Sequence, residues 1–187
     1  MLLSVHQLTA GYAEPVLGPV TFSLERGEIL GLVGPNGCGK STLLSALLAA
    51  VRIFSGEVTR APGLVVTLQT QQQPDVAGVP LTGAELLSLT GAGRDGLPLW
   101  LHERLGERLD RLSGGQRQFL HLWSCLQAPG DVVLLDEPTN NLDPDGVAHL
   151  AGALKMRAAE GGGLVVVSHD AEFLASVCSR LIRLGEV

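Results

Sequence analysis

The sequence has 187 residues, 45% of them hydrophobic and 17% charged, which is enough apolar material for one domain with a real core and room for a subdomain. Its formal net charge of −6 argues against a nucleic-acid-binding protein, because such proteins usually present a basic surface. Its three cysteines, Cys38, Cys125 and Cys178, are too widely spaced for a disulfide framework or a metal-binding motif, and they favour a reducing compartment.

The N-terminal part of the chain predicts short strands around one helix. The expected strands are Leu3–Leu8, Val20–Leu24, Ile29–Val33, Glu57–Thr59 and Leu64–Leu68. A turn is expected at Gly18-Pro19, and leucines and alanines at helical spacing predict a helix over Ser41–Val51. The chain begins without a secretion signal, and none of its apolar runs reaches the roughly 18 residues of a membrane-spanning helix. Any role at a membrane would therefore need a partner.

In the C-terminal part, helices alternate with continuously apolar strands of the type that is buried on both faces. The expected helices are Gly83–Thr90, Pro98–Leu109, a helix opened by Ser113 that continues to Leu126, Pro144–Glu160 and Ala171–Val177. The expected strands are Val132–Leu135, Leu164–Val167 and Arg180–Leu184. This pattern predicts an α/β fold with a covered parallel sheet, interrupted by a helical lobe from about Gly83 to Gln127.

A glycine-rich loop follows the expected strand Ile29–Val33 and opens the expected helix. Its residues, Gly34-Pro35-Asn36-Gly37-Cys38-Gly39-Lys40-Ser41, fit the G-x-x-x-x-G-K-[ST] pattern in the context between strand and helix that supports it. In this pattern, backbone N–H groups wrap a phosphate chain at the start of a helix. Lys40 is expected to contact the β- and γ-phosphates and Ser41 to bind Mg²⁺, with Thr42 extending the hydrogen bonding. Cys38 is expected to fill a loop position rather than to act as a redox switch.

Two consecutive acids stand at the end of the apolar strand Val132–Leu135. Ligands bind at the carboxyl ends of strands in open α/β sheets, and an acid at this point completes the Mg²⁺ shell of P-loop NTPases. Asp136 is therefore expected to bind Mg²⁺. Glu137 is expected to polarise the attacking water as a general base, because the chain turns at the strand end and both acids can then face one site.

The segment Leu112-Ser113-Gly114-Gly115-Gln116 combines a capping box with two glycines. Ser113 and Gln116 can satisfy each other's backbone N–H groups at a helix start. The two glycines cost helix stability, but they leave bare N–H groups at the positive end of the helix, where an anion can approach. The segment therefore predicts a second anion-binding element.

Together these motifs resemble the ATP-binding cassette (ABC) ATPase family over almost the whole chain. Gly34–Ser41 is similar to its Walker A motif, Leu112–Gln116 to its signature, and Val132–Glu137 to its Walker B motif with the catalytic glutamate. The resemblance implies a P-loop NTPase (RecA-like) core, an antiparallel β subdomain and a small inserted helical subdomain. We expect a single domain over residues 1–187, with the core over about 1–71 and 128–187 and the helical subdomain over about 72–127.

Three more residues match functional positions of this family. Tyr12 matches the aromatic residue that stacks on adenine, and Asp143 matches the acid of the D-loop. His169 matches the switch histidine, which contacts the γ-phosphate and senses hydrolysis. Each would therefore contribute to ATP binding or catalysis.

The family's Q-loop glutamine, which serves Mg²⁺ and catalysis, has two candidates. Gln71 is preferred, because Pro80-Leu81-Thr82 then follows at the interval of metal-ion and cobalamin-type importers. Gln69 is the alternative, because it could end the preceding strand cleanly. The cleft beside Gln71 would receive a short helix of an integral membrane subunit.

The resemblance also implies a partnership between two copies of the chain. A signature cannot reach its own P-loop in this family, so two subunits pair head to tail, and a homodimer is expected here. Ser113, Gly114, Gly115 and Gln116 would then contact the ATP held by the partner. The chain would power transport, with a lean toward import of metal ions or chelates, from the cytoplasmic face of the membrane. A soluble ABC ATPase in translation, repair or cofactor assembly is the alternative.

The chain departs from the family's usual pattern at three points. Phe119 stands where the family usually has a basic residue, and the helical block is short. The sequence stops at Val187, soon after the last expected strand, so we expect no regulation by a C-terminal appendage. The change at Phe119 concerns the surface of the helical lobe and not the residues expected to bind ATP.

Overall fold

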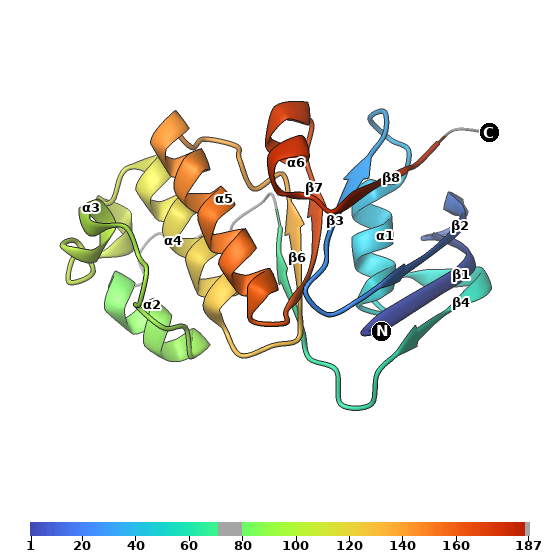
Figure 1. The fold of residues 1–187 in the computed structure, drawn as a ribbon, viewed down its shortest axis with the longest axis horizontal. Helices are drawn as coiled ribbons and strands as arrows, with labels where there is room; N and C mark the ends of the chain where they lie inside the picture. Colours follow the sequence, from blue (N-terminus) through green and yellow to red (C-terminus); the bar gives the residue numbers. More distant parts are fainter. Residues whose placement is uncertain (71–79, 186–187) are drawn as a thin grey trace.

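The computed structural model describes residues 1–70 and 80–185, and within these ranges the strands form two sheets (Figure 1). The smaller sheet is antiparallel, with the order β2-β1-β4: β1 (Leu3–Gly11), β2 (Pro15–Leu24) and β4 (Arg52–Arg60). The larger sheet is parallel, with the order β5-β6-β7-β3-β8: β5 (Val66–Gln69), β6 (Val132–Asp136), β7 (Gly163–Val167), β3 (Ile29–Val33) and β8 (Arg180–Arg183). The predicted α/β class with a parallel sheet is confirmed.

Helices cover both faces of the parallel sheet, and Figure 1 shows how they are arranged. Helix α1 (Lys40–Leu47) lies between the two sheets. The other helices lie on the opposite side or at the far end: α2 (Gly83–Thr90), α3 (Leu99–His102), the 3₁₀ turn η1 (Leu109–Arg111), α4 (Gly114–Gln127), α5 (Pro144–Ala159) and α6 (Ala171–Val177). Side chains alternate between the two faces of the parallel sheet, so the hydrophobic core has one part on each face. In β6, Val133 and Leu135 pack with α4 and α5, whereas Val132 and Leu134 pack with α1.

Most expected elements are present, several with the predicted bounds. Ile29–Val33, Gly83–Thr90 and Ala171–Val177 match residue for residue. The expected helix over Ser41–Val51 instead ends at Leu47, and Ala49 just beyond it has a φ of 56°. That left-handed backbone cannot continue a right-handed helix, so the predicted C-terminal bound was too long.

The turn predicted at Gly18-Pro19 is wrong, because both residues lie inside β2. The chain reverses earlier, between the end of β1 at Gly11 and the start of β2 at Pro15. A proline lacks an N–H group, but an edge strand needs no partner on its outer side. β2 is such an edge, so proline is tolerated within it.

The helix predicted over Pro98–Leu109 is also wrong. Only Leu99–His102 is α-helical, and after it the chain forms single turns in which Arg104 and Glu107 donate to residues three positions earlier. The carbonyls of Leu105 and Glu107 instead accept the first N–H groups of α2, from Ala84 and Gly83, at 2.8 and 3.3 Å. Because these carbonyls serve a tertiary contact, they are not available to an i to i+4 helix.

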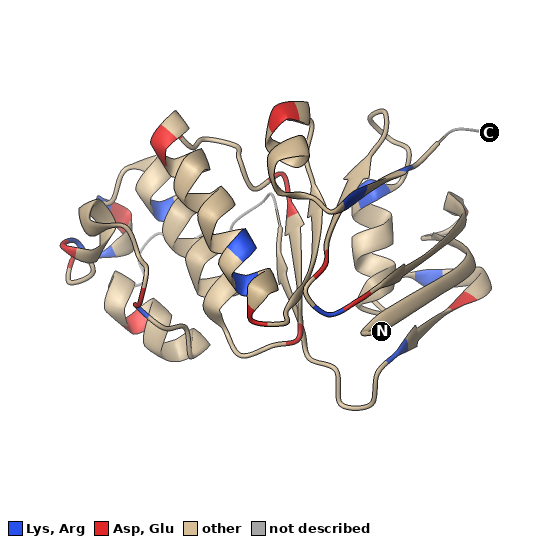
Figure 2. Cartoon of the chain, viewed as in Figure 1, with Lys and Arg blue, Asp and Glu red and all other residues tan. Residues whose placement is uncertain are grey.

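Charged side chains are spread over the described fold. Figure 2 shows Lys and Arg along both sheets and several helices, interspersed with Asp and Glu. Within residues 1–70 and 80–185, none of the helices has the length and apolar character that crossing a membrane requires.

Candidate functional site

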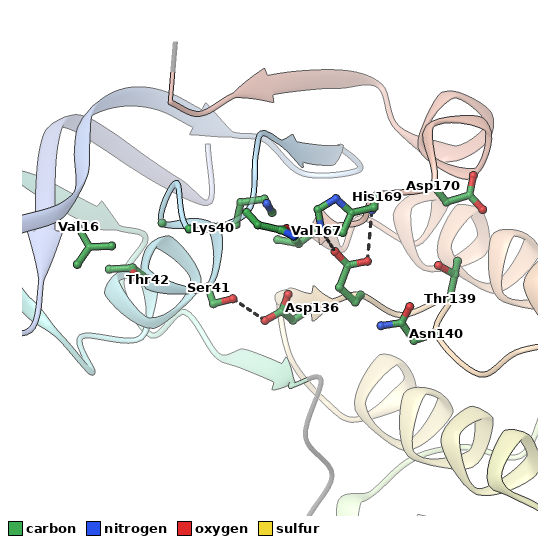
Figure 3. Close-up of a pocket in the computed structure, with 14 residues that line it drawn as sticks. Val16, Lys40, Ser41, Thr42, Asp136, Thr139, Asn140, Val167, His169 and Asp170 are labelled. Carbon is green, nitrogen blue, oxygen red and sulfur yellow. Dashed lines mark hydrogen bonds and ion pairs between the residues drawn. The ribbon is translucent and has the colours of Figure 1, made fainter. Parts of the chain in front are cut away.

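Three of the predicted catalytic residues, Lys40, Glu137 and His169, lie at one edge of the parallel sheet, because the carboxyl ends of its strands meet there. The glycine-rich loop follows β3, Asp136 ends β6, and His169 lies two residues beyond β7. Together they border a pocket of about 600 Å³, shown in Figure 3. From here on it is called the P-loop pocket, and its lining residues are Val16, Asn36, Gly37, Gly39, Lys40, Ser41, Thr42, Asp136, Glu137, Thr139, Asn140, Val167, His169 and Asp170.

The loop between β3 and α1 holds a cation beside the start of a helix. Gly39 caps α1 with a φ of 95°, and a Cβ there would lie 2.9 Å from that of Leu17, so only glycine fits. The Lys40 ammonium donates to the carbonyls of Gly34 and Pro35, at 2.8 and 3.0 Å, and the residue is 8% exposed. A buried cation next to a helix N-terminus makes this side of the pocket attractive to phosphate groups.

Ser41 and Asp136 meet across the pocket, although 95 residues separate them in sequence. The Ser41 hydroxyl donates to Oδ2 of Asp136 at 2.9 Å. Mg²⁺ prefers oxygen ligands and commonly binds one or two protein groups together with waters and substrate phosphates. One hydroxyl and one carboxylate beside the Lys40 ammonium therefore fit a Mg²⁺ ion that is bound together with a phosphate chain.

Glu137 is held in an uncommon conformation next to His169. Its φ is 51°, in the left-handed region, and its N–H donates to the Val167 carbonyl at 2.9 Å. The His169 N–H donates to Oε2 of Glu137 at 3.3 Å, and the ring Nε2 lies 3.1 Å from Oε1 (Figure 3). The carboxylate is thus directed beside the histidine and into the pocket, and Glu137 is only 8% exposed. An acid in this position can accept a proton from a water molecule bound in the pocket.

The signature residues line a second pocket, of about 350 Å³, called here the signature pocket. Its lining residues are Trp100, Ser113, Gly115, Gln116, Asn141, Leu142, Asp143, Asp145 and Gly146. The capping box forms as predicted: the Gln116 N–H donates to Ser113 Oγ at 3.2 Å, and the Ser113 N–H donates to Gln116 Oε1 at 3.0 Å. A Cβ on Gly115 would lie 3.0 Å from the Asn141 carbonyl. The signature pocket and the P-loop pocket are lined by different residues, so the signature is separate from the P-loop pocket of the same chain.

Several predicted ATP-binding residues stand outside the lining of both pockets. Tyr12 is 63% exposed in the connection between β1 and β2. Cys38 packs against the core on the α1 side of the sheet. The residues that line the P-loop and signature pockets include neither Tyr12 nor Cys38. They also do not include Gly34, Pro35 and Gly114.

The remaining predicted residues have mixed outcomes. Asp143 lines the signature pocket and also caps α5, accepting from the Gly146 N–H at 2.8 Å. Gln71 lies outside the described residues. Gln69 ends β5, as the alternative assignment expected, and it is 5% exposed.

Sequence reasoning missed some residues of the two pockets. Val16, Thr139 and Asp170 line the P-loop pocket, and Trp100 lines the signature pocket. Val16 comes from the antiparallel sheet and Trp100 from α3, so no local pattern connects them to the motifs. Thr139 and Asp170 stand within three residues of Glu137 and His169, and this proximity is the one signal that could have identified them.

Family models match two parts of the chain. A model described as "ABC transporter" matches residues 17–80, and a model of an AAA domain matches residues 99–175. The chain is 36% identical to the zinc import ATP-binding protein ZnuC of Cereibacter sphaeroides, over 98% of this chain and 79% of that protein. It is 34% identical to ZnuC of Roseobacter denitrificans, over 98% of this chain and 75% of that protein.

Solved structures of the same kind share the fold. A structure of an ATP-binding subunit of an ABC transporter superposes with a TM-score of 0.82 at 25% identity, covering 98% of this chain and 86% of that one. A metal-chelate type ABC transporter in an inward-facing conformation gives a TM-score of 0.80 at 24% identity, covering 98% of this chain and 80% of that chain. At this lower identity the likeness concerns the fold alone.

Proposed function

Because the chain belongs to the ATP-binding subunits of ABC transporters, we propose how its residues share the work of a dimeric ATPase. The chain is an ATPase subunit that binds ATP with Mg²⁺ and powers transport through a separate membrane partner. The relatives support this function over that of a soluble ATPase in translation, repair or cofactor assembly. The division of roles among residues, the arrangement of the dimer and the transported substrate are the proposal.

In the P-loop pocket, Lys40 leaves the carbonyls of Gly34 and Pro35 and contacts the β- and γ-phosphates of ATP. Ser41 and Asp136 would hold Mg²⁺, with Gln71 as a further ligand, and the ion would supply neutralisation of the phosphate charge. Asn36, Gly37, Gly39 and Thr42 supply backbone and side-chain contacts to the phosphates, and Tyr12 stacks on the adenine. The short distance between the Ser41 hydroxyl and the Asp136 carboxylate supports this assignment.

Hydrolysis uses the pair of Glu137 and His169. Glu137 accepts a proton from the water that attacks the γ-phosphate, and His169 contacts the same phosphate. The contacts between the two residues hold Glu137 at the pocket wall. This preorganisation costs no rearrangement at the moment of reaction.

The separation of the two pockets is the observation that carries the dimeric reading. Within one chain, Ser113 and Gly115 line the signature pocket, whereas Lys40 lines the P-loop pocket. A head-to-tail pair of copies would bring each signature to the other copy's ATP. Ser113, Gly114, Gly115 and Gln116 would then offer helix N–H groups to the γ-phosphate, and Asp143 would lie at the interface.

A trapped dimer tests this arrangement. Glu137→Gln should bind Mg·ATP but hardly hydrolyse it, and it should accumulate as a dimer in size-exclusion chromatography with Mg·ATP. Adding Ser113→Arg to this variant should abolish the dimer and leave ATP binding by the monomer unchanged. Near-normal turnover of Glu137→Gln would exclude the proposed role of this residue.

A matched control separates the signature from general effects of an added arginine. Ser88 is exposed on α2 and lies outside both pockets. Ser88→Arg combined with Glu137→Gln should therefore still dimerise with Mg·ATP. If both arginine variants lose the dimer, or if Ser113→Arg alone loses ATP binding, the composite site is contradicted.

The proposed transport substrate is zinc, taken up by a complex at the cytoplasmic face of a membrane. Named relatives are zinc import ATP-binding proteins, and this supports metal import as the direction and class of transport. In the host cell, loss of the gene should raise the zinc concentration needed for growth. The wild-type gene should restore growth and Glu137→Gln should not, whereas a defect relieved by another metal would contradict zinc.

The proposed domain division assigns the core to about residues 1–71 and 128–187, and the helical subdomain to about 72–127. The parallel sheet with α1, α5 and α6 supports the core, and the grouping of α2, α3 and α4 supports the helical subdomain.

A further inference from the structure

His169 lies in the middle of a three-residue turn between β7 and α6. β7 ends at Val167, and α6 begins at Ala171. Ser168, the first residue of the turn, is only 3% exposed, although its side chain is polar. It is not among the residues that line the P-loop pocket or the signature pocket. Its hydroxyl therefore acts within the protein, and its contacts indicate what it does there.

The hydroxyl of Ser168 binds the backbone on the other side of His169. Its Oγ accepts a hydrogen bond from the N–H of Asp170 at 3.1 Å. A serine hydroxyl that binds the N–H two residues later holds the chain in a local turn. Ser168 directly follows β7, whose five residues are all buried in the parallel sheet. The first end of the turn is therefore fixed to the sheet.

Asp170 fixes the second end of the turn to α6. Its Oδ1 accepts the N–H of Phe173 at 2.9 Å, which caps the helix, and its carbonyl accepts the N–H of Leu174 at 3.0 Å. Phe173 and Leu174 are buried in the core, so the start of α6 is held in place. The hydrogen bond from Asp170 to Ser168 thus joins a fixed helix to a fixed strand.

His169 is held between these two ends. Its N–H donates to Oε2 of Glu137 at 3.3 Å, and its ring Nε2 lies 3.1 Å from Oε1 (Figure 3). The His169 side chain is 57% exposed, so burial of the ring does not determine its orientation. The backbone dihedrals of the turn decide where the N–H points, because the peptide unit is planar. The hydrogen bond between Ser168 and Asp170 restrains those dihedrals.

We propose that Ser168 is a positioning residue for ATP hydrolysis, and that its hydroxyl fixes the turn that presents the N–H and the ring of His169 to Glu137. A general base that is held in place before the reaction accelerates it, and loss of alignment slows the chemical step. The inference rests on the proposed function, because Ser168 acts through His169 and Glu137. ATP binding should not depend on this hydroxyl, since Lys40 lies on α1.

Two substitutions separate the hydrogen bond of Ser168 from the space that its side chain fills. Ser168→Cys keeps a similar volume but replaces a strong acceptor with a weak one, whereas Ser168→Thr keeps the oxygen and adds a methyl group. In steady-state ATPase assays, Ser168→Cys should lower kcat roughly tenfold or more and change the KM for ATP by less than about twofold. Ser168→Thr should retain about half of kcat or more. Equal losses in the two variants, a normal kcat in Ser168→Cys, or a change in KM alone overturns the proposal.

Ser176 offers a matched control on the neighbouring helix. It is an exposed serine of α6, its Oγ donates to the Phe173 carbonyl at 2.8 Å, and it lines neither pocket. Ser176→Cys, assayed with the same reducing agent, should leave kcat and KM unchanged. A fall in kcat equal to that of Ser168→Cys would mean that a cysteine anywhere in this segment disturbs the enzyme, and the specific role of Ser168 would be lost.

A double-mutant cycle tests whether Ser168 acts through His169. In single-turnover assays, Ser168→Cys should cause no further loss of rate in a His169→Ala background, because the group that it positions is already absent. A purely structural role for Ser168 would instead add its own loss to that of His169→Ala. Additive losses therefore contradict the positioning role.

A binding measurement separates this inference from the proposed function. Glu137→Gln combined with Ser168→Cys should still form the dimer with Mg·ATP, because folding and nucleotide binding are intact. Loss of that dimer would give Ser168 a role in folding or ATP binding and overturn the inference. Near-normal turnover of Glu137→Gln alone would contradict the proposed function. If Glu137→Gln and His169→Ala lose activity while Ser168→Cys keeps it, only the role of Ser168 is wrong.

Discussion

At the residue scale, Glu137 shows what the local sequence can and cannot predict. Its predicted role as a general base follows from its place after an apolar strand that ends in Asp136. Its left-handed φ of 51° does not, because a non-glycine residue adopts that backbone only when its surroundings hold it there. The hydrogen bond from its N–H to Val167 and the contacts of its carboxylate with His169 supply those surroundings.

His121 gives a prediction about acid stability. Burial, together with the nearby Arg117, holds its folded-state pKa below the ordinary value of 6.5, so the unfolded chain binds the proton more readily than the folded protein does. Unfolding is therefore favoured progressively as the pH falls below about 6.5. His121→Leu removes this dependence, so wild-type protein should lose more unfolding free energy than the variant between about pH 7.5 and pH 5.5. Urea denaturation measures the unfolding free energy of both proteins, and parallel losses would contradict the half-buried, neutral ring.

At the scale of single elements, α2 and α4 begin with capping boxes of the same geometry. Thr82 and Glu85 start α2, and Ser113 and Gln116 start α4. Both pairs satisfy backbone N–H groups at a helix start, but only the second is followed by two glycines and lines the signature pocket. Comparison of the two pairs separates helix capping from ligand binding.

Alanine at each cap tests that separation. Ser113→Ala should lower the free energy of unfolding by about 1 kcal/mol, through the loss of the cap, and Thr82→Ala should destabilise the protein similarly. Only Ser113→Ala should also weaken the Mg·ATP-dependent dimer of Glu137→Gln. Thermal denaturation and size-exclusion chromatography measure the two effects. An equal loss of dimer in both variants would mean that Ser113 acts through stability alone.

The helix predicted over Pro98–Leu109 is wrong because of contacts between neighbouring elements. Its apolar spacing is real, since Leu101, Leu105 and Leu109 are all buried. Burial of these side chains did not require a continuous helix, because the carbonyls of Leu105 and Glu107 serve α2 instead. Hydrophobic spacing thus predicted the buried face correctly and the backbone incorrectly.

At the scale of the whole molecule, the separation of the P-loop and signature pockets leads to a prediction about concentration. If each ATP needs both pockets and they come from two copies, dilute protein should be a poor enzyme. ATPase activity per chain should rise with protein concentration and level off once the dimer predominates. Steady-state assays over a roughly thousandfold dilution series would measure this. Constant activity per chain would show that one copy suffices.

The sequence by itself determined the class of fold and predicted which residues would form the site. Lys40, Ser41, Asp136 and Glu137 were identified from motifs whose spacing is local, and the apolar strands implied the parallel sheet. Local signals suffice there, because a strand followed by a glycine loop and a helix builds its own phosphate site.

The tertiary structure alone decided which distant groups meet. It brought Val16 to the P-loop pocket, placed Trp100 beside the signature, and brought Gln69 and His121 into the walls of one pocket. It also kept the signature apart from Lys40 within one chain. Such contacts depend on strand order and on the packing of helices against both faces of a sheet, and a pattern of neighbours along the chain does not encode them.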